Sequence, residues 1–156
     1  MPLLYLEDLH VGQRFTSAPR TLDRETMIRF AREWDPQPFH LDDDAARGSF
    51  FQGLAGSGWF TAAVTMRLLV DGGVPLANGI IGTGGELLWT KPTRPGDTLH
   101  VECEILAITP SRSKPDRGMV EVRCLTLNQE GETVQSFTPK LVVFRRPAVA
   151  EDGKGV

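Results

Sequence analysis

The sequence lacks the features of several large classes of protein. No stretch approaches the roughly 20 consecutive apolar residues that a membrane-spanning helix requires. Only two cysteines are present, Cys103 and Cys124, and each lies in an alternating apolar segment, which favours small buried thiols over a disulfide or metal ligands. The formal net charge is only -3, so no general positive field would attract nucleic acid. We therefore expect neither a membrane span nor a nucleic-acid partner.

Common catalytic signatures are absent as well. The chain has no Gly-x-Ser-x-Gly turn, no Gly-Lys-Ser/Thr phosphate loop and no Gly-x-Gly-x-x-Gly segment opening a βαβ unit. The histidines have neither the His-x-x-x-His spacing nor the cysteine partners of a zinc site, so neither a metal nor a redox cofactor is predicted. The first 15 residues lack the basic start and long apolar core of a signal peptide, which predicts a cytoplasmic location.

The chain's 156 residues fit one domain, which we place at residues 1–147, followed by a flexible tail over 148–156. Asp23 can cap a helix over residues 24–34, whose apolar stripe is predicted to face the core: Met27, Phe30, Ala31 and Trp34. Residues 57–70 are apolar nearly all round, which predicts a buried central helix with Ser57 as its cap. The small residues over 53–58 indicate that the backbone at the start of this helix closely approaches another group.

The second half of the chain is rich in β-branched and alternating apolar residues. Five strands are predicted, over residues 79–83, 86–90, 98–107, 118–128 and 132–145. Helices followed by a run of strands suit an α+β fold in which an antiparallel sheet wraps around one apolar helix.

One short segment pairs a carboxylate with an imidazole. Asp35 and His40 flank Pro36 and Pro38, which should interrupt the helix and hold the segment in a rigid, non-helical crossing. Such a pair can exchange protons with a water molecule, and the amide of Gly58 at the start of the central helix could stabilise an enolate-like anion. Taken singly, each residue also fits a structural role: Asp35 as a turn former, His40 as a buried structural histidine and Gly58 as a packing residue.

The segment Asp35-Pro36-Gln37-Pro38-Phe39-His40 resembles the Asp-x-Asn-Pro-[Ile/Leu]-His motif of the MaoC-like (R)-specific enoyl-CoA hydratases and dehydratases. The resemblance continues through Leu41, Asp42, Ala45, Ala46, Phe51 and Gly58, then through residues 85–92 and 95–97, and spans about residues 5 to 146. Two positions depart from the family: Gln37 replaces the motif's asparagine, and Thr65 and Met66 stand where the hydratases commonly have a serine.

The resemblance implies a hot-dog homodimer, or a higher oligomer, with an acyl-CoA thioester as its ligand. It implies syn hydration of a trans-2-enoyl-CoA, in which Asp35 activates water, His40 shares that water and the proton, and the Gly58 amide binds the thioester oxygen. Coenzyme A would arrive as part of the substrate. We expect further substrate contacts from Gln37, Ser57, Trp59, Thr65 and Met66.

Two other functions remain open from the residues. A hot-dog thioesterase would release a thiol from a saturated acyl-CoA, and a non-catalytic binding module would keep Asp35 and His40 for structure alone. Bulky side chains at Trp59, Phe60 and Met66 could also narrow the acyl pocket or could be simple core.

Overall fold

A computed structural model describes residues 2–149. Most of the predicted tail over 148–156 therefore lies outside the described residues. The elements in chain order are η1 (Leu6–Asp8), β1 (Arg14–Thr16), β2 (Arg20–Thr21), α1 (Arg24–Trp34), α2 (Pro38–Leu41), α3 (Asp43–Arg47), α4 (Gly58–Leu68), η2 (Leu69–Gly73), β3 (Gly82–Trp89), β4 (Thr98–Pro110), β5 (Arg117–Leu127) and β6 (Thr133–Phe144).

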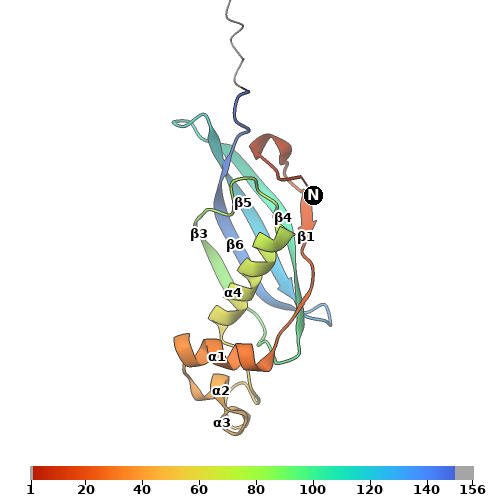
Figure 1. Cartoon of the computed structure of the whole chain (residues 1–156), viewed down its shortest axis with the longest axis vertical. Coiled ribbons are helices and arrows are strands. Elements are labelled where there is room, and N and C mark those ends of the chain that lie inside the picture. Colours follow the sequence, from red (N-terminus) through yellow and green to blue (C-terminus); the bar gives the residue numbers. More distant parts are fainter. Residues whose placement is uncertain (1, 150–156) are drawn as a thin grey trace, which may run out of the picture.

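The strands form one antiparallel sheet in the order β1-β4-β5-β6-β3, with β2 paired to β4. Helix α4 lies obliquely across one face of this sheet, and α1, α2 and α3 gather at one end, beside the start of α4 (Figure 1). The α+β prediction is confirmed. The two strands predicted over 79–83 and 86–90 are one strand, β3, with an irregular register between Gly82 and Gly84.

The core forms between the sheet and the inward face of α4. Alternate residues of β4 and β5 point inward and are buried, as period-two sequences dictate, and they meet Phe60, Val64 and Leu68 of α4. Cys103 and Cys124 face each other across β4 and β5, and both are buried free thiols, as predicted. Their mutual hydrogen bond and their burial raise the pKa of Cys103, so this thiol is unreactive in the folded chain.

Two predictions about burial were wrong. Helix α4 is not buried all round, because Trp59 and Met66 on its outward side are exposed in the single chain, as is Val70 in the following element, η2. In α1, which Asp23 caps as predicted, Met27 and Ala31 are buried, but Trp34 is 67% exposed. Trp34 is the last residue of α1, where the chain turns away from the core toward Asp35.

In the described part of the chain, no helix combines the length and the apolar character needed to cross a membrane.

Candidate active site

Asp35 and His40 are brought together by the two prolines, although the local structure differs from the prediction. Asp35 ends α1, and Pro38 begins a separate one-turn helix, α2, that carries His40. The segment is therefore a break between two helices and not a wholly non-helical crossing, because proline suits the first turn of a helix. The reversal leaves His40 Nε2 3.3 Å from Asp35 Oδ2. The predicted convergence of the two side chains is thus present.

The orientation of the His40 ring is fixed by its surroundings. The Nδ1 atom lies 2.7 Å from the carbonyl oxygen of Ala55, which can only accept a hydrogen bond, so Nδ1 carries a proton. Phe39 packs edge-on against the imidazole at 4.6 Å between ring centroids, and Phe51 lies at 5.8 Å. The side chain is almost completely buried. Nε2 is therefore the ring atom that faces Asp35 and is left for proton exchange.

Three groups surround the Asp35 carboxylate. Ser57 Oγ donates to Oδ2 at 2.7 Å, and Gln37 Nε2 donates to Oδ1 at 2.6 Å. Burial raises the pKa of Asp35, but the hydrogen bonds from Ser57 and Gln37 and the charge of His40 outweigh it, so the pKa lies below its ordinary value. Asp35 is therefore an ionised acceptor at neutral pH. Gln37 in place of the motif's asparagine still hydrogen-bonds within the site.

Ser57 occupies the cap position of α4 but does not act as its cap. Its side chain makes no hydrogen bond to the helix, because its hydroxyl is used by Asp35. The first-turn amides of a helix have no acceptor inside that helix. The amide of Gly58 is one of these first-turn amides. The Ser57 side chain does not cap this end of α4.

An open cavity of about 530 Å³ lies beside these groups. Its walls are mostly aromatic and apolar, and its lining is Asp35, Gln37, Phe39, His40, Phe50, Phe51, Gly56, Gly58, Trp59, Thr61, Trp89, Thr90, Lys91, Pro92 and Thr93. Of the predicted site residues, Asp35, Gln37, His40, Gly58 and Trp59 line this cavity.

Three predicted substrate contacts lie elsewhere in the described structure. Ser57 is behind Asp35, and neither Thr65 nor Met66 is part of the cavity lining. Thr65 faces the sheet, where its hydroxyl lies 2.7 Å from that of Thr126, and Met66 points to the outer side of α4. Thr65 lies two turns beyond Gly58, on nearly the same face of α4 but roughly 10 Å farther along the helix axis, where it meets the sheet instead of the cavity.

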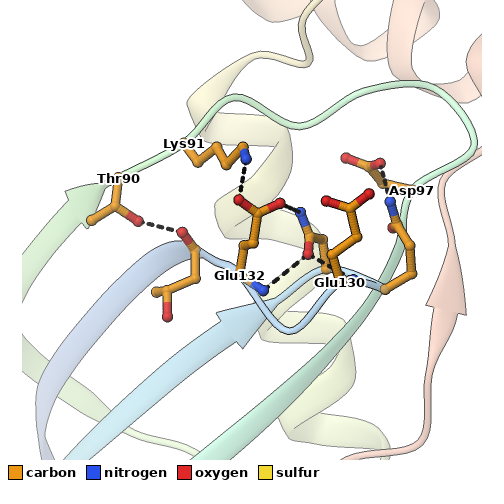
Figure 2. A network of polar contacts seen from close by, with 8 residues as sticks. Thr90, Lys91, Asp97, Glu130 and Glu132 are labelled. Carbon is orange, nitrogen blue, oxygen red and sulfur yellow. Dashed lines mark hydrogen bonds and ion pairs between the residues drawn. The ribbon is translucent and has the colours of Figure 1, made fainter.

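Residues 90–93 form one wall of the cavity and are fastened to the turn between β5 and β6 (Figure 2). Thr90 Oγ1 donates to the Thr133 carbonyl at 2.6 Å, and Lys91 forms an ion pair with Glu132. Hydrogen bonds from Lys91, Glu130 and Asn128 lower the pKa of Glu132 to about 2. Glu132 is therefore ionised at neutral pH and offsets the charge of Lys91 at the cavity wall.

Arg94 holds the part of the cavity wall formed by Phe51 in place. Its guanidinium donates to the carbonyl oxygens of Phe51 at 2.6 Å, Gly53 at 2.8 Å and Leu54 at 3.1 Å. These bonds fix the loop that ends at Ala55, the acceptor of the His40 proton. The sequence places Trp89 in the family-like segment 85–92 but does not mark it or Arg94 as a site residue, because the role of each depends on contacts with distant parts of the chain.

Residues 8–126 match the sequence pattern of the MaoC like domain. This chain belongs to the MaoC-like family. A solved structure of a MaoC-like dehydratase from Rhodospirillum rubrum is 63% identical, with a TM-score of 0.92, over 93% of this chain and 99% of that one. The uncharacterised protein YdeM of Bacillus subtilis is 31% identical over 89% of this chain and 96% of its own length. The unliganded (R)-hydratase PhaJ1 from Pseudomonas aeruginosa is 25% identical, with a TM-score of 0.72, over 94% of this chain and 92% of that one.

These relatives confirm the family and the fold. The MaoC-like chain has the hot-dog arrangement that the sequence predicted, a sheet curved around one helix, and its structural neighbours include dehydratases and (R)-hydratases.

Proposed function

We propose that this MaoC-like chain is a hydro-lyase that adds water reversibly to a trans-2-enoyl-CoA and gives the (3R)-hydroxyacyl-CoA. The observation that carries the proposal is the approach of His40 Nε2 and Asp35 Oδ2 to 3.3 Å at the wall of an apolar cavity, beside the open end of α4. The similarity to an (R)-hydratase over nearly the whole chain supports it.

The proposed step balances with acid-base groups alone, so it needs neither a metal nor a redox cofactor. Ionised Asp35 takes one proton from water, and the hydroxide forms a bond to C3 of the enoyl group. The electron pair of the double bond moves toward the thioester oxygen, where the Gly58 amide stabilises the negative charge. The proton that Asp35 has taken passes to the free Nε2 of His40 and from there to C2, which restores both the carboxylate and the neutral imidazole. Because both groups lie on one side of the cavity, the addition is syn.

The proposal is tested with crotonyl-CoA, by following the loss of the conjugated thioester absorbance and the configuration of the product. We expect saturable formation of the (3R)-alcohol by wild type. Release of free thiol from a saturated acyl-CoA, with no hydration, would identify a thioesterase instead. Binding of acyl-CoA with neither reaction would identify a binding module. Either of these two results would overturn the proposal.

We also propose that the chain works as a homodimer in the cytoplasm. In the described residues, β3 pairs with β6 along one edge and has no strand along the other, and Trp59 and Met66 of α4 and Val70 of η2 leave exposed apolar side chains. Unpaired strand edges and apolar faces are typical of surfaces that a second copy covers. Sedimentation equilibrium should give twice the mass of one chain, and the mass of a single chain would contradict the dimer.

A further inference from the structure

Trp89 marks where the cavity ends. Among the lining residues, those from α4 stop at Thr61, and none comes from β5 or β6. The indole of Trp89 lies directly against the start of α4, because a Cβ placed on Gly58 would come within 2.6 Å of Trp89 Cε2. Trp89 also packs edge-to-face on Trp59, with 5.1 Å between ring centroids. The cavity therefore does not continue into the space between the helix and the sheet.

A chain of hydrogen bonds that leads from the half-exposed Trp89 into the core fixes the indole in this position. Its Nε1 donates to Gln135 Oε1 at 2.9 Å, and Gln135 Nε2 donates to Thr65 Oγ1 at 3.1 Å. The Thr65 hydroxyl is in turn 2.7 Å from that of Thr126. The direction of the first two bonds is unambiguous, because an indole N–H can only donate and must meet the oxygen of the amide.

These polar groups lie in the interior of the domain. Gln135 and Thr65 are each 1% exposed and Thr126 is 0% exposed. A buried amide or hydroxyl is costly when it loses its partner, so each member of the chain resists displacement of its neighbour. Trp89 is therefore held by more than packing, and a ligand that pushed it aside would leave the Gln135 amide oxygen without its donor.

We propose that Trp89, positioned by Gln135 and Thr65, is the end wall of the acyl pocket and restricts this site to thioesters of short acyl chains. The inference rests on the proposed hydratase function and adds the substrate class. The thioester oxygen must reach the Gly58 amide, and the indole occupies the space next to that glycine. The acyl carbons beyond C3 then meet Trp89 after a short distance and have no apolar channel to enter.

The test is the rate of hydration of trans-2-enoyl-CoA substrates with four, six and eight acyl carbons. Wild type should prefer the four-carbon substrate, measured as kcat/KM. Trp89→Ala should reverse this order of preference. Each substrate methylene that gains an apolar contact should raise kcat/KM about fourfold. We expect the eight-to-four ratio to rise on the order of tenfold or more. Trp89→Phe, which keeps an aromatic wall but is smaller, should give an intermediate ratio and serves if the alanine variant does not fold.

Gln135→Met tests the positioning role, since it keeps the length of the side chain and removes the acceptor for the indole. The eight-to-four ratio should rise in the same direction as in Trp89→Ala, but less. A purely structural role for Gln135 would lower all three rates together. Trp34→Ala is the matched control, because it removes an exposed indole outside the cavity and should leave the ratio unchanged.

Failure of this inference is distinguishable from failure of the hydratase function. Equal rates for four and eight carbons in wild type, or an unchanged ratio in folded Trp89→Ala, would overturn the role of Trp89 while hydration stands. If no enoyl-CoA is hydrated, calorimetric binding of butyryl-CoA and octanoyl-CoA decides the matter. Tighter binding of the short chain by wild type, reversed in Trp89→Ala, would support the end wall without catalysis. Any other pattern would overturn it.

Discussion

Replacing Ser57 by alanine should weaken the protein through the charge on Asp35. Ser57 is fully buried and its hydroxyl donates to Asp35 Oδ2 at 2.7 Å. A hydrogen bond to a charged group contributes about 1.5–3 kcal/mol, so we expect Ser57→Ala to lower the free energy of unfolding at pH 7 by roughly that amount. The loss should also raise the pKa of Asp35, because this hydrogen bond is the largest of the effects that lower it.

The effect of Ser57→Ala should depend on pH in a defined direction. The pKa of Asp35 is lower in the folded chain than in the unfolded chain, so its ionised form stabilises the fold above the ordinary aspartate pKa of about 3.9. That contribution is lost as the pH falls through the lower pKa of the folded state. The difference between wild type and Ser57→Ala should therefore be constant from pH 7 to about pH 5 and should shrink at lower pH.

Urea unfolding at a series of pH values measures this difference. Ser49→Ala is a matched control, because the Ser49 hydroxyl has only neutral partners: it donates to the carbonyl of Ala46 at 2.6 Å and accepts from the amide of Phe51 at 3.2 Å. Its loss should cost about 0.5–1.5 kcal/mol at every pH. Equal, pH-independent losses for both variants would refute the claim that Ser57 stabilises an ionised Asp35.

Three further substitutions address the site. Asp35→Asn should reduce the hydration rate roughly 100- to 10,000-fold and leave a folded protein. Asp44→Asn, which alters only an exposed ion pair, should leave the rate unchanged. A fully active Asp35→Asn would show that Asp35 is not the base. Gly58→Ala should cost about 1–3 kcal/mol in unfolding, since its methyl group would meet the indole, and this cost should shrink in a Trp89→Ala background; additive costs would contradict the contact. Arg94→Met should lower the unfolding free energy by at least about 2 kcal/mol, measured in urea, because it removes the donor to three loop carbonyls; a loss below about 0.5 kcal/mol would show that those bonds matter little.

The helix starts and the proton-exchanging pair could be predicted because local sequence determines them. Asp23 and Asp42 cap α1 and α3 through bonds to amides three residues later, a pattern that sequence spacing reveals directly. The two prolines force a break within a few residues, so the approach of Asp35 to His40 needs almost no information from the rest of the chain. The long strands β4, β5 and β6 follow from their alternation in the same way.

The supporting groups could not be predicted because they depend on contacts between distant parts of the chain. The position of Ser57 predicts a helix cap. In the fold, however, its hydroxyl donates to Asp35 and makes no hydrogen bond to the amides of α4. Thr65 reads as a substrate contact by analogy, yet it faces Gln135 and Thr126 across the core. In each case a local rule is overridden by a tertiary partner that the sequence does not bring near.

The same distinction separates the chemistry of the site from its selectivity. Asp35 and His40 come from one continuous segment, so the proton transfer requires that segment, the carbonyl of Ala55 and the start of α4. Trp89 comes from β3, its acceptor Gln135 from β6 and the next partner Thr65 from α4, so the end of the cavity requires the whole sheet to be assembled. Substitutions on β3 and β6 can therefore change which acyl chain fits without touching the groups that move protons. For this reason the ratio of rates for long and short substrates, and not the rate on one substrate, is the measurement that reports on Trp89.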